Sequence, residues 1–193
     1  MMVVLPSVQL CGHIKMRSKV IHNKEQAVEY LLEQKVVALY QGQSEYGPRA
    51  LGNRSILFDP RNPKGKDIIN GIKKREWFRP FAGTIMLEYV HDYFEMLTLK
   101  ESPYMSFAVQ AKEKAIKEVP SIIHVDNTCR IQTVTREQNK HFYELIEEFY
   151  NKTGVPILFN TSFNLAGEPL VETLADAIDT VNRSEIDYIY VPL

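Results

Sequence analysis

Residues 41–61, QGQSEYGPRALGNRSILFDPR, combine turn-forming residues with permanent cations. The glycines, which permit positive φ or close backbone approach, are Gly42, Gly47 and Gly52. The guanidinium groups, whose planar donor forks match phosphate, belong to Arg49, Arg54 and Arg61. Pro48 suits the first turn of a helix. The pattern predicts either an anion-binding turn or a turn-rich connection whose arginines pair with Glu45 and Asp59.

A second basic segment, KKREWFRPFA at 73–82, surrounds its cations with aromatic rings. The cations are Lys73, Lys74, Arg75 and Arg79. If a helix continues to Pro80, Arg75 and Arg79 lie on one helical face and both reach the same phosphate chain. The composition is equally typical of a basic helix C-terminus followed by core aromatics, or of a stacking platform for single-stranded nucleic acid. The segment alone leaves these three interpretations open.

Short polar side chains follow an apolar run in LFNTSFNLAGEP, residues 158–169. Asn160, Ser162 and Asn164 come directly after this predicted strand, and open α/β sheets bind ligands at the carboxyl ends of their strands. Such side chains donate to phosphate or ribose oxygens. The alternative is an Asx or ST turn that caps the next helix.

An arginine and an amide share one face of the predicted strand within HVDNTCRIQTV, residues 124–134. Arg130 and Gln132 lie two residues apart, so both side chains point to the same side of a strand. This pair suits a small planar carboxylate-like or urea-like group. The alternative is an ion pair between Arg130 and Asp126.

Other reactive side chains form no familiar catalytic pattern. The two cysteines lie far apart, and the five histidines are scattered without an HExxH arrangement. A nucleophile built from Cys129 and His124 has no further support, so we expect Cys129 to be a buried small side chain. The chain also lacks the GxSxG, Walker and GxGxxG motifs. We therefore expect no protein-borne metal site, and chemistry that relies on charge and positioning, with magnesium carried by a nucleotide.

Helical and strand patterns alternate along the chain. Helices are predicted over residues 24–34, 64–75, near 88–96, 136–151 and 172–183. Strands are predicted over residues 36–40, 83–87, 105–110, 121–125, 130–134, 157–159 and 187–191. This order predicts an α/β domain with a mixed or mostly parallel sheet over residues 21–193. Residues 1–20 are expected to form an extension or a linker remnant.

Composition limits the possible classes of protein. The chain has 193 residues, 45% of them hydrophobic, and a net charge of -1. These values fit one compact soluble domain and give no support for broad electrostatic binding of nucleic acid. No run approaches the roughly 20 apolar residues that a membrane span needs, and no export signal is recognisable. The cysteine usage fits a reducing cytoplasm.

Four motifs together carry a family resemblance. GPRALGNRSIL, INGIKKREWFRPFA, RIQTV and LFNTSFNLAGEP, in this order and spacing, resemble the C-terminal part of the NodU/CmcH-type O-carbamoyltransferases. The similarity extends from about residue 36 to the end of the chain. That part of the family is itself similar to the YrdC-like fold of threonylcarbamoyladenylate synthases. The resemblance implies a twisted mixed sheet, flanked by helices, around a deep and positively charged nucleotide cavity.

The resemblance also implies an activity. In the family, the YrdC-like domain takes carbamoyl phosphate and ATP and yields carbamoyl adenylate. A separate N-terminal domain with metal-binding histidines then transfers the carbamoyl group to a hydroxyl acceptor. This sequence shows no counterpart of that domain, so we expect the activation half-reaction at most from this chain, which fits a fragment better than a standalone protein.

Site residues are carried over by motif. The resemblance assigns the phosphates of ATP and carbamoyl phosphate to Arg49, Arg54, Lys73, Arg75 and Arg79. It assigns the carbamoyl end to Arg130, with Gln132 on the same strand face, and the adenylate to Asn160, Ser162 and Asn164. Two other functions remain open: threonylcarbamoyladenylate synthesis, and a noncatalytic RNA-binding module in which Trp77 and Phe78 stack bases.

Overall fold

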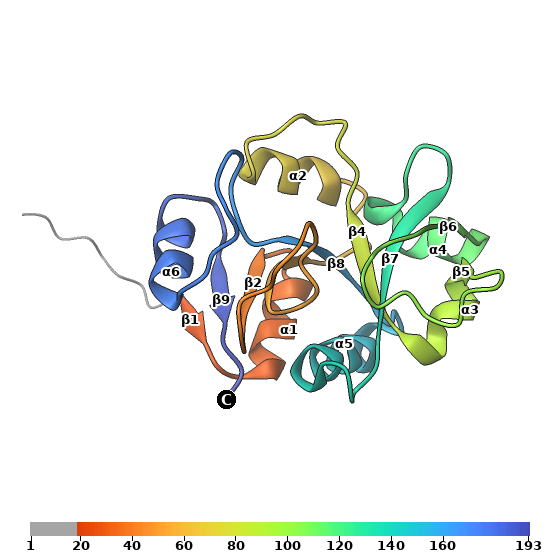
Figure 1. The fold of residues 1–193 in the computed structure, drawn as a ribbon, viewed down its shortest axis with the longest axis horizontal. Coiled ribbons are helices and arrows are strands. Elements are labelled where there is room, and N and C mark those ends of the chain that lie inside the picture. Colours follow the sequence, from red (N-terminus) through yellow and green to blue (C-terminus); the bar gives the residue numbers. More distant parts are fainter. Residues whose placement is uncertain (1–18) are drawn as a thin grey trace, which may run out of the picture.

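The computed structural model describes residues 19–193, and most of the predicted extension at residues 1–20 lies outside them. Figure 1 shows a twisted sheet with α2 above it and α1 and α5 below it. The strands are β1 (Val20–Ile21), β2 (Val37–Tyr40), β3 (Arg54–Phe58), β4 (Ala82–Met86), β5 (Phe94–Glu95), β6 (Ala108–Ala111), β7 (Thr128–Val134), β8 (Ile157–Ser162) and β9 (Tyr188–Tyr190). The α-helices are α1 (Lys24–Leu32), α2 (Gly65–Ile72), α3 (Val90–Tyr93), α4 (Glu113–Glu118), α5 (Lys140–Thr153) and α6 (Leu174–Asn182). Two 3₁₀ turns are η1 (Leu87–Tyr89) and η2 (Pro120–Ile122).

The described strands form one mixed sheet in the order β1-β9-β2-β3-β8-β4-β7-β6-β5. β4 pairs with β7 in parallel, and β9 is parallel to both β1 and β2. β8 lies antiparallel between β3 and β4. The predicted α/β class with a mixed sheet flanked by helices is confirmed. The order places β7 and β8, which carry two of the predicted polar motifs, on either side of β4.

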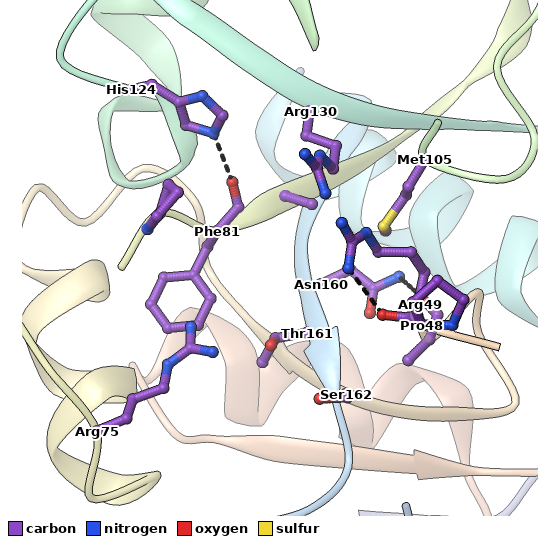
Figure 2. Close-up of a pocket in the computed structure, with 13 residues that line it drawn as sticks. Pro48, Arg49, Arg75, Phe81, Met105, His124, Arg130, Asn160, Thr161 and Ser162 are labelled. Carbon is purple, nitrogen blue, oxygen red and sulfur yellow. Dashed lines mark hydrogen bonds between the residues drawn. The ribbon is translucent and has the colours of Figure 1, made fainter. Parts of the chain in front are cut away.

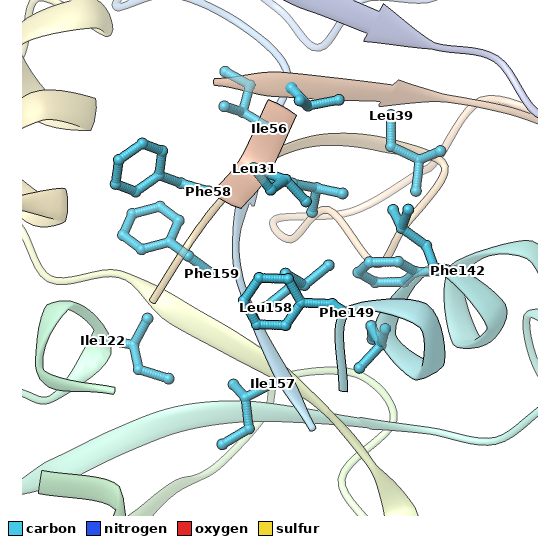
Figure 3. Close-up of a cluster of buried hydrophobic side chains, with 14 of the residues drawn as sticks. Leu31, Leu39, Ile56, Phe58, Ile122, Phe142, Phe149, Ile157, Leu158 and Phe159 are labelled. Atoms are coloured by element: carbon cyan, nitrogen blue, oxygen red, sulfur yellow. The ribbon is translucent and has the colours of Figure 1, made fainter. Parts of the chain in front are cut away.

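The central strand β8 is buried on both faces, which explains its unbroken apolar run. Residues 157–159 are fully buried, and Asn160 is 1% exposed. Figure 3 shows Leu158 near Phe149 and Phe142 of α5, whereas Phe159 lies beside Phe58 on the other side. The Phe58 and Phe159 rings pack edge to face, with their centroids 6.4 Å apart. The core therefore fixes β8 firmly just before its polar C-terminal end.

Several predicted elements differ from the structure. The apolar run at 121–125 is not a strand; Pro120 begins the turn η2, and the chain then bends at His124. The helix predicted over 64–75 ends at Ile72, because Lys74 adopts a positive φ of 52°. The helix predicted near 88–96 is reduced to η1 and α3. β3 was missed because its apolar residues directly follow a turn-rich segment.

The segment between β2 and β3 has the glycine conformations that the sequence predicts, but no helix begins at Pro48. Gly52 has a φ of +108°, and a Cβ at this position would lie 2.2 Å from Cδ1 of Phe142 in α5. Glycine is therefore required here for both conformation and space. The close packing on α5 holds this segment over the C-terminal end of β8.

Candidate functional site

A cavity of about 250 Å³ opens beside the C-terminal part of β8, as Figure 2 shows. Its charged side chains include three guanidinium groups, and no carboxylate among residues 19–193 lines it. The lining residues are Pro48, Arg49, Ala50, Arg75, Pro80, Phe81, Ala82, Met105, His124, Arg130, Asn160, Thr161 and Ser162. We call it the first cavity. It brings together parts of all four motifs singled out in the sequence.

A second cavity adjoins the first and shares Arg75 and Ser162 with it. It is lined by Lys73, Lys74, Arg75, Glu76, Arg79, Ser162, Asn164, Leu165, Ala166 and Gly167. Most of its charged side chains are cationic. The two neighbouring cavities together suit a ligand with several anionic groups.

Glu45 and Gln132 hold the segment that carries Arg49. The Glu45 carboxylate accepts the backbone N–H groups of Leu51 at 2.7 Å, Asn53 at 3.2 Å and Arg54 at 3.1 Å. Burial raises the pKa of Glu45 despite these hydrogen bonds. Gln132 Nε2 donates to the Leu51 carbonyl at 2.9 Å. Gln132 therefore positions the wall of the first cavity without lining it. The sequence left open an ion pair between Glu45 and an arginine; in the structure the Glu45 carboxylate accepts hydrogen bonds from backbone N–H groups.

Arg54, which the resemblance assigns to phosphate, lines neither cavity. It is 2% exposed, and its guanidinium donates to the carbonyls of Gln41 at 2.6 Å and Glu172 at 3.0 Å. It also lies 3.8 Å from the centre of the Tyr40 ring. These contacts join the end of β2 to the segment before α6. Arg54 therefore stabilises this connection through its hydrogen bonds.

Arg75 projects toward the junction of the two cavities. Its Nε donates to Asn70 Oδ1 at 2.7 Å, and its guanidinium lies 4.1 Å from the centre of the Phe81 ring. Burial and the nearby charge of Arg79 lower the pKa of Arg75 to about 10. Its Nη2 is buried and has no hydrogen-bond partner among residues 19–193. A buried unpaired donor is costly, so this nitrogen points to a ligand acceptor.

Lys73 is 3% exposed and faces four oxygens at the end of β8. Its Nζ donates to the carbonyls of Ser162 at 2.6 Å and Asn164 at 2.9 Å, and to the side-chain oxygens of both residues. Burial and the neighbouring guanidinium of Arg75 lower the pKa of Lys73 to about 7. Lys73 therefore joins the second cavity to the turn after β8.

The remaining predicted cations each line one of the two cavities. Arg130 enters the first cavity from β7, while Asp126 accepts hydrogen bonds from Thr128 in place of the arginine. Arg79 lines the second cavity and pairs with Glu76 at 2.7 Å. Because α2 ends early, Arg75 and Arg79 do not share a helical face. The turn after α2 brings them to the same cavity.

Several residues that line the first cavity were not predicted from the sequence. His124 lines the first cavity and hydrogen-bonds through its ring nitrogens to Thr128 and to the Phe81 carbonyl, each at 3.1 Å. Met105 reaches the same cavity from the connection before β6. Only the long-range pairing of strands brings these segments together, so no local signal identified them. Cys129 is fully buried as predicted, and burial raises its pKa to about 12, which suppresses thiolate chemistry.

Residues 19–193 contain no group of three or more histidine, cysteine, aspartate or glutamate side chains placed to hold a metal ion. Over the same residues, no helix combines the length and the apolar character needed to cross a membrane.

Solved structures with a similar fold include two proteins described with ligands. Full-length HypF, in its phosphate- and nucleotide-bound form, superposes with a TM-score of 0.63 and 19% identity over 86% of this chain and 20% of its own. P. abyssi Sua5, complexed with L-threonine, has a TM-score of 0.65 and 15% identity over 90% of this chain and 49% of its own. At these identities the similarity establishes the YrdC-like fold alone.

Sequence relatives establish the family. Nodulation protein NolNO of Sinorhizobium fredii is 46% identical over 167 residues, which are 86% of this chain and 25% of that protein. Nodulation protein NolO of Bradyrhizobium diazoefficiens is 42% identical over 86% of this chain and 30% of its own length. The chain thus spans less than a third of these relatives. The family described as carbamoyltransferase C-terminus matches residues 28–192, and the chain belongs to this family.

Proposed function

We propose that this domain binds carbamoyl phosphate and ATP and forms carbamoyl adenylate. The observation that carries the proposal is the junction of the two cavities at Arg75, where a buried guanidinium nitrogen has no partner among residues 19–193. The first cavity suits the small carbamoyl substrate. The larger, more open second cavity suits the nucleotide phosphates. The membership of the carbamoyltransferase family supports this choice of substrates.

The proposed reaction proceeds in two steps. Water cleaves carbamoyl phosphate to carbamate and phosphate. A carbamate oxygen then attacks the α-phosphorus of ATP, a new P–O bond forms, and the bond to the pyrophosphate oxygen breaks. Magnesium enters as part of the Mg-ATP substrate and neutralises phosphate charge. No protein nucleophile is needed, because positioned donors stabilise the charge that builds on the nonbridging oxygens.

The cations have separate tasks in this scheme. Arg130 and Arg49 bind the carbamoyl substrate in the first cavity. In the second cavity Arg79 binds the triphosphate, and the charge of Lys73, whose donors are used by Ser162 and Asn164, attracts it. Arg75 lies between them and bridges the two ligands at the reacting centre. Ser162 and Asn164 hold the adenylate, and Lys73 fixes their positions through its hydrogen bonds.

Transfer of the carbamoyl group to a hydroxyl acceptor belongs, in this proposal, to a separate N-terminal domain with metal-binding histidines. The chain spans 25% of the length of NolNO. In this proposal the N-terminal domain acts together with the domain described here, in the same chain or in a separate one. Both substrates are cytoplasmic metabolites, which makes the cytoplasm the expected location.

The test is release of pyrophosphate from Mg-ATP by the purified chain. Three conditions are compared: carbamoyl phosphate, threonine with bicarbonate, and neither. The proposal requires release that depends on carbamoyl phosphate. Release with threonine and bicarbonate alone would favour a threonylcarbamoyladenylate synthase-like activity. ATP binding without any release would mean that the domain needs its partner for catalysis.

RNA binding without catalysis is the second candidate function. Trp77 is 73% exposed and Phe78 is 62% exposed, so neither ring is a core residue and both are free to stack on bases. Binding of single-stranded RNA would weaken steeply as salt is raised, whereas a nucleotide enclosed in the cavities is less sensitive to salt. A salt titration of RNA and ATP binding separates the two candidates.

A further inference from the structure

The Asn160 side chain has an unused hydrogen-bond acceptor inside the first cavity. Asn160 is 1% exposed and lines that cavity at the end of β8. Its Oδ1 is buried and has no hydrogen-bond partner among the described residues. Figure 2 shows the amide between Arg130 and the segment that carries Pro48 and Arg49. Buried polar atoms are seldom left unpaired, so this oxygen points to a donor supplied by a ligand.

A chain of hydrogen bonds fixes the orientation of this amide. Asn160 Nδ2 donates to the Ala50 carbonyl at 3.2 Å, to Thr84 Oγ1 at 3.0 Å and to Gln132 Oε1 at 3.3 Å. Gln132 is itself oriented, because its Nε2 donates to the Leu51 carbonyl and its Oε1 accepts from Thr84. Turning the Asn160 amide over would set Oδ1 against two acceptors. The network therefore keeps the amide in the orientation that directs Nδ2, and not Oδ1, toward these protein acceptors.

The surrounding charges define what the ligand must offer. The guanidinium groups of Arg49, Arg75 and Arg130 line the same cavity and only donate hydrogen bonds. A ligand that satisfies both the guanidinium groups and Asn160 carries anionic oxygens together with an N–H donor. A carbamoyl group attached to phosphate has this combination, whereas an acetyl group of nearly the same shape lacks the N–H.

We propose that Asn160 is the residue that selects carbamoyl over other acyl groups, by accepting a hydrogen bond from the carbamoyl nitrogen. This inference rests on the proposed function and moves Asn160 from the adenylate to the carbamoyl end. An acyl group without an N–H would leave the buried Oδ1 without a partner, so it should bind about tenfold to a hundredfold more weakly than a carbamoyl group. Gln132 and Thr84 are positioning residues for this contact.

The first experiment compares two stable analogues in calorimetric titrations of the unaltered chain. Phosphonoacetamide presents an amide where carbamoyl phosphate does, and 2-oxopropylphosphonate has a methyl group in its place. We expect phosphonoacetamide to bind at least about tenfold more tightly. Equal affinities would overturn the role of Asn160 and leave carbamoyl phosphate as the substrate. Binding of neither analogue would contradict both the carbamoyl phosphate site and the selection.

Variants then assign the preference to one side chain. In Asn160→Ala the ratio of the two affinities is expected to fall close to one, mainly through weaker binding of phosphonoacetamide. Asn182→Ala is the matched control, because Asn182 is exposed at the end of α6 and lines neither cavity, so its loss should leave the ratio unchanged. Thermal unfolding shows whether each variant is folded. A preference that survives in folded Asn160→Ala would refute the proposal.

Discussion

Replacing Arg75 with methionine is expected to separate activity from stability. The substitution removes the hydrogen bond from Nε to Asn70 and the contact with the Phe81 ring. These contribute about 1.5–3 kcal/mol and about 0.5–1 kcal/mol respectively. It also removes the buried unpaired Nη2, which relieves about 1–3 kcal/mol. The losses and the gain largely offset each other, so the free energy of unfolding should fall by only about 1 kcal/mol.

Activity should respond much more strongly to Arg75→Met. A donor aimed at charge that develops in the transition state is typically worth about a hundredfold or more in rate. We expect carbamoyl-dependent pyrophosphate release to fall by at least about that factor in a protein that remains folded. Chemical denaturation and the pyrophosphate assay measure the two effects on the same preparation.

Arg61→Met is the matched control for this prediction. Arg61 pairs with Asp59 at 2.7 Å and lines neither of the two cavities. Its loss should cost stability and leave the rate per folded molecule unchanged. Near-normal pyrophosphate release in Arg75→Met, or a rate that falls only in proportion to unfolded protein, would refute the assignment of Arg75.

Three further predictions follow from the same geometry. Arg130→Ala should lower carbamoyl adenylate formation at least about a hundredfold, and unchanged turnover would remove Arg130 from the site. The pKa of Lys73 is about 7, and anionic phosphates favour its ammonium form. ATP binding should therefore take up protons at pH 7–8 and weaken as the pH rises. Calorimetric titrations in buffers of different ionisation enthalpy measure the proton uptake, and proton release would contradict the prediction. Gly52→Ala should lower the free energy of unfolding by about 2–4 kcal/mol. Gly154→Ala, whose added Cβ meets no described atom within 4 Å, should lower it by only about 1 kcal/mol. Equal losses of the two variants in denaturant titrations would refute the steric argument.

Periodic patterns identified most of the fold. The helix predicted over residues 24–34 is α1, and the run around RIQTV is β7, because apolar spacing reports directly which face an element buries. β3 was not predicted, because its five residues are all buried, show no regular alternation of polar and apolar residues, and follow a glycine-rich turn. The end of α2 depended on the positive φ of Lys74, which the sequence does not indicate.

The candidate site was predictable in residue types and less so in roles. Arginines near a turn look alike in sequence, yet Arg49 lines the cavity while Arg54 is buried among carbonyl groups. The burial of Lys73 could not be anticipated, since lysine is rarely buried. The free oxygen of Asn160 depends on Gln132, and strand pairing alone brings the two residues together.

Direct detection of the intermediate is the most decisive measurement. The chain is incubated with Mg-ATP and carbamoyl phosphate labelled with carbon-13, quenched rapidly, and analysed by mass spectrometry. We expect an adduct of AMP that contains the labelled carbon, together with pyrophosphate. Formation of AMP and pyrophosphate without label in the adduct, or hydrolysis of carbamoyl phosphate in the presence of bound ATP without any AMP, would contradict the proposed function.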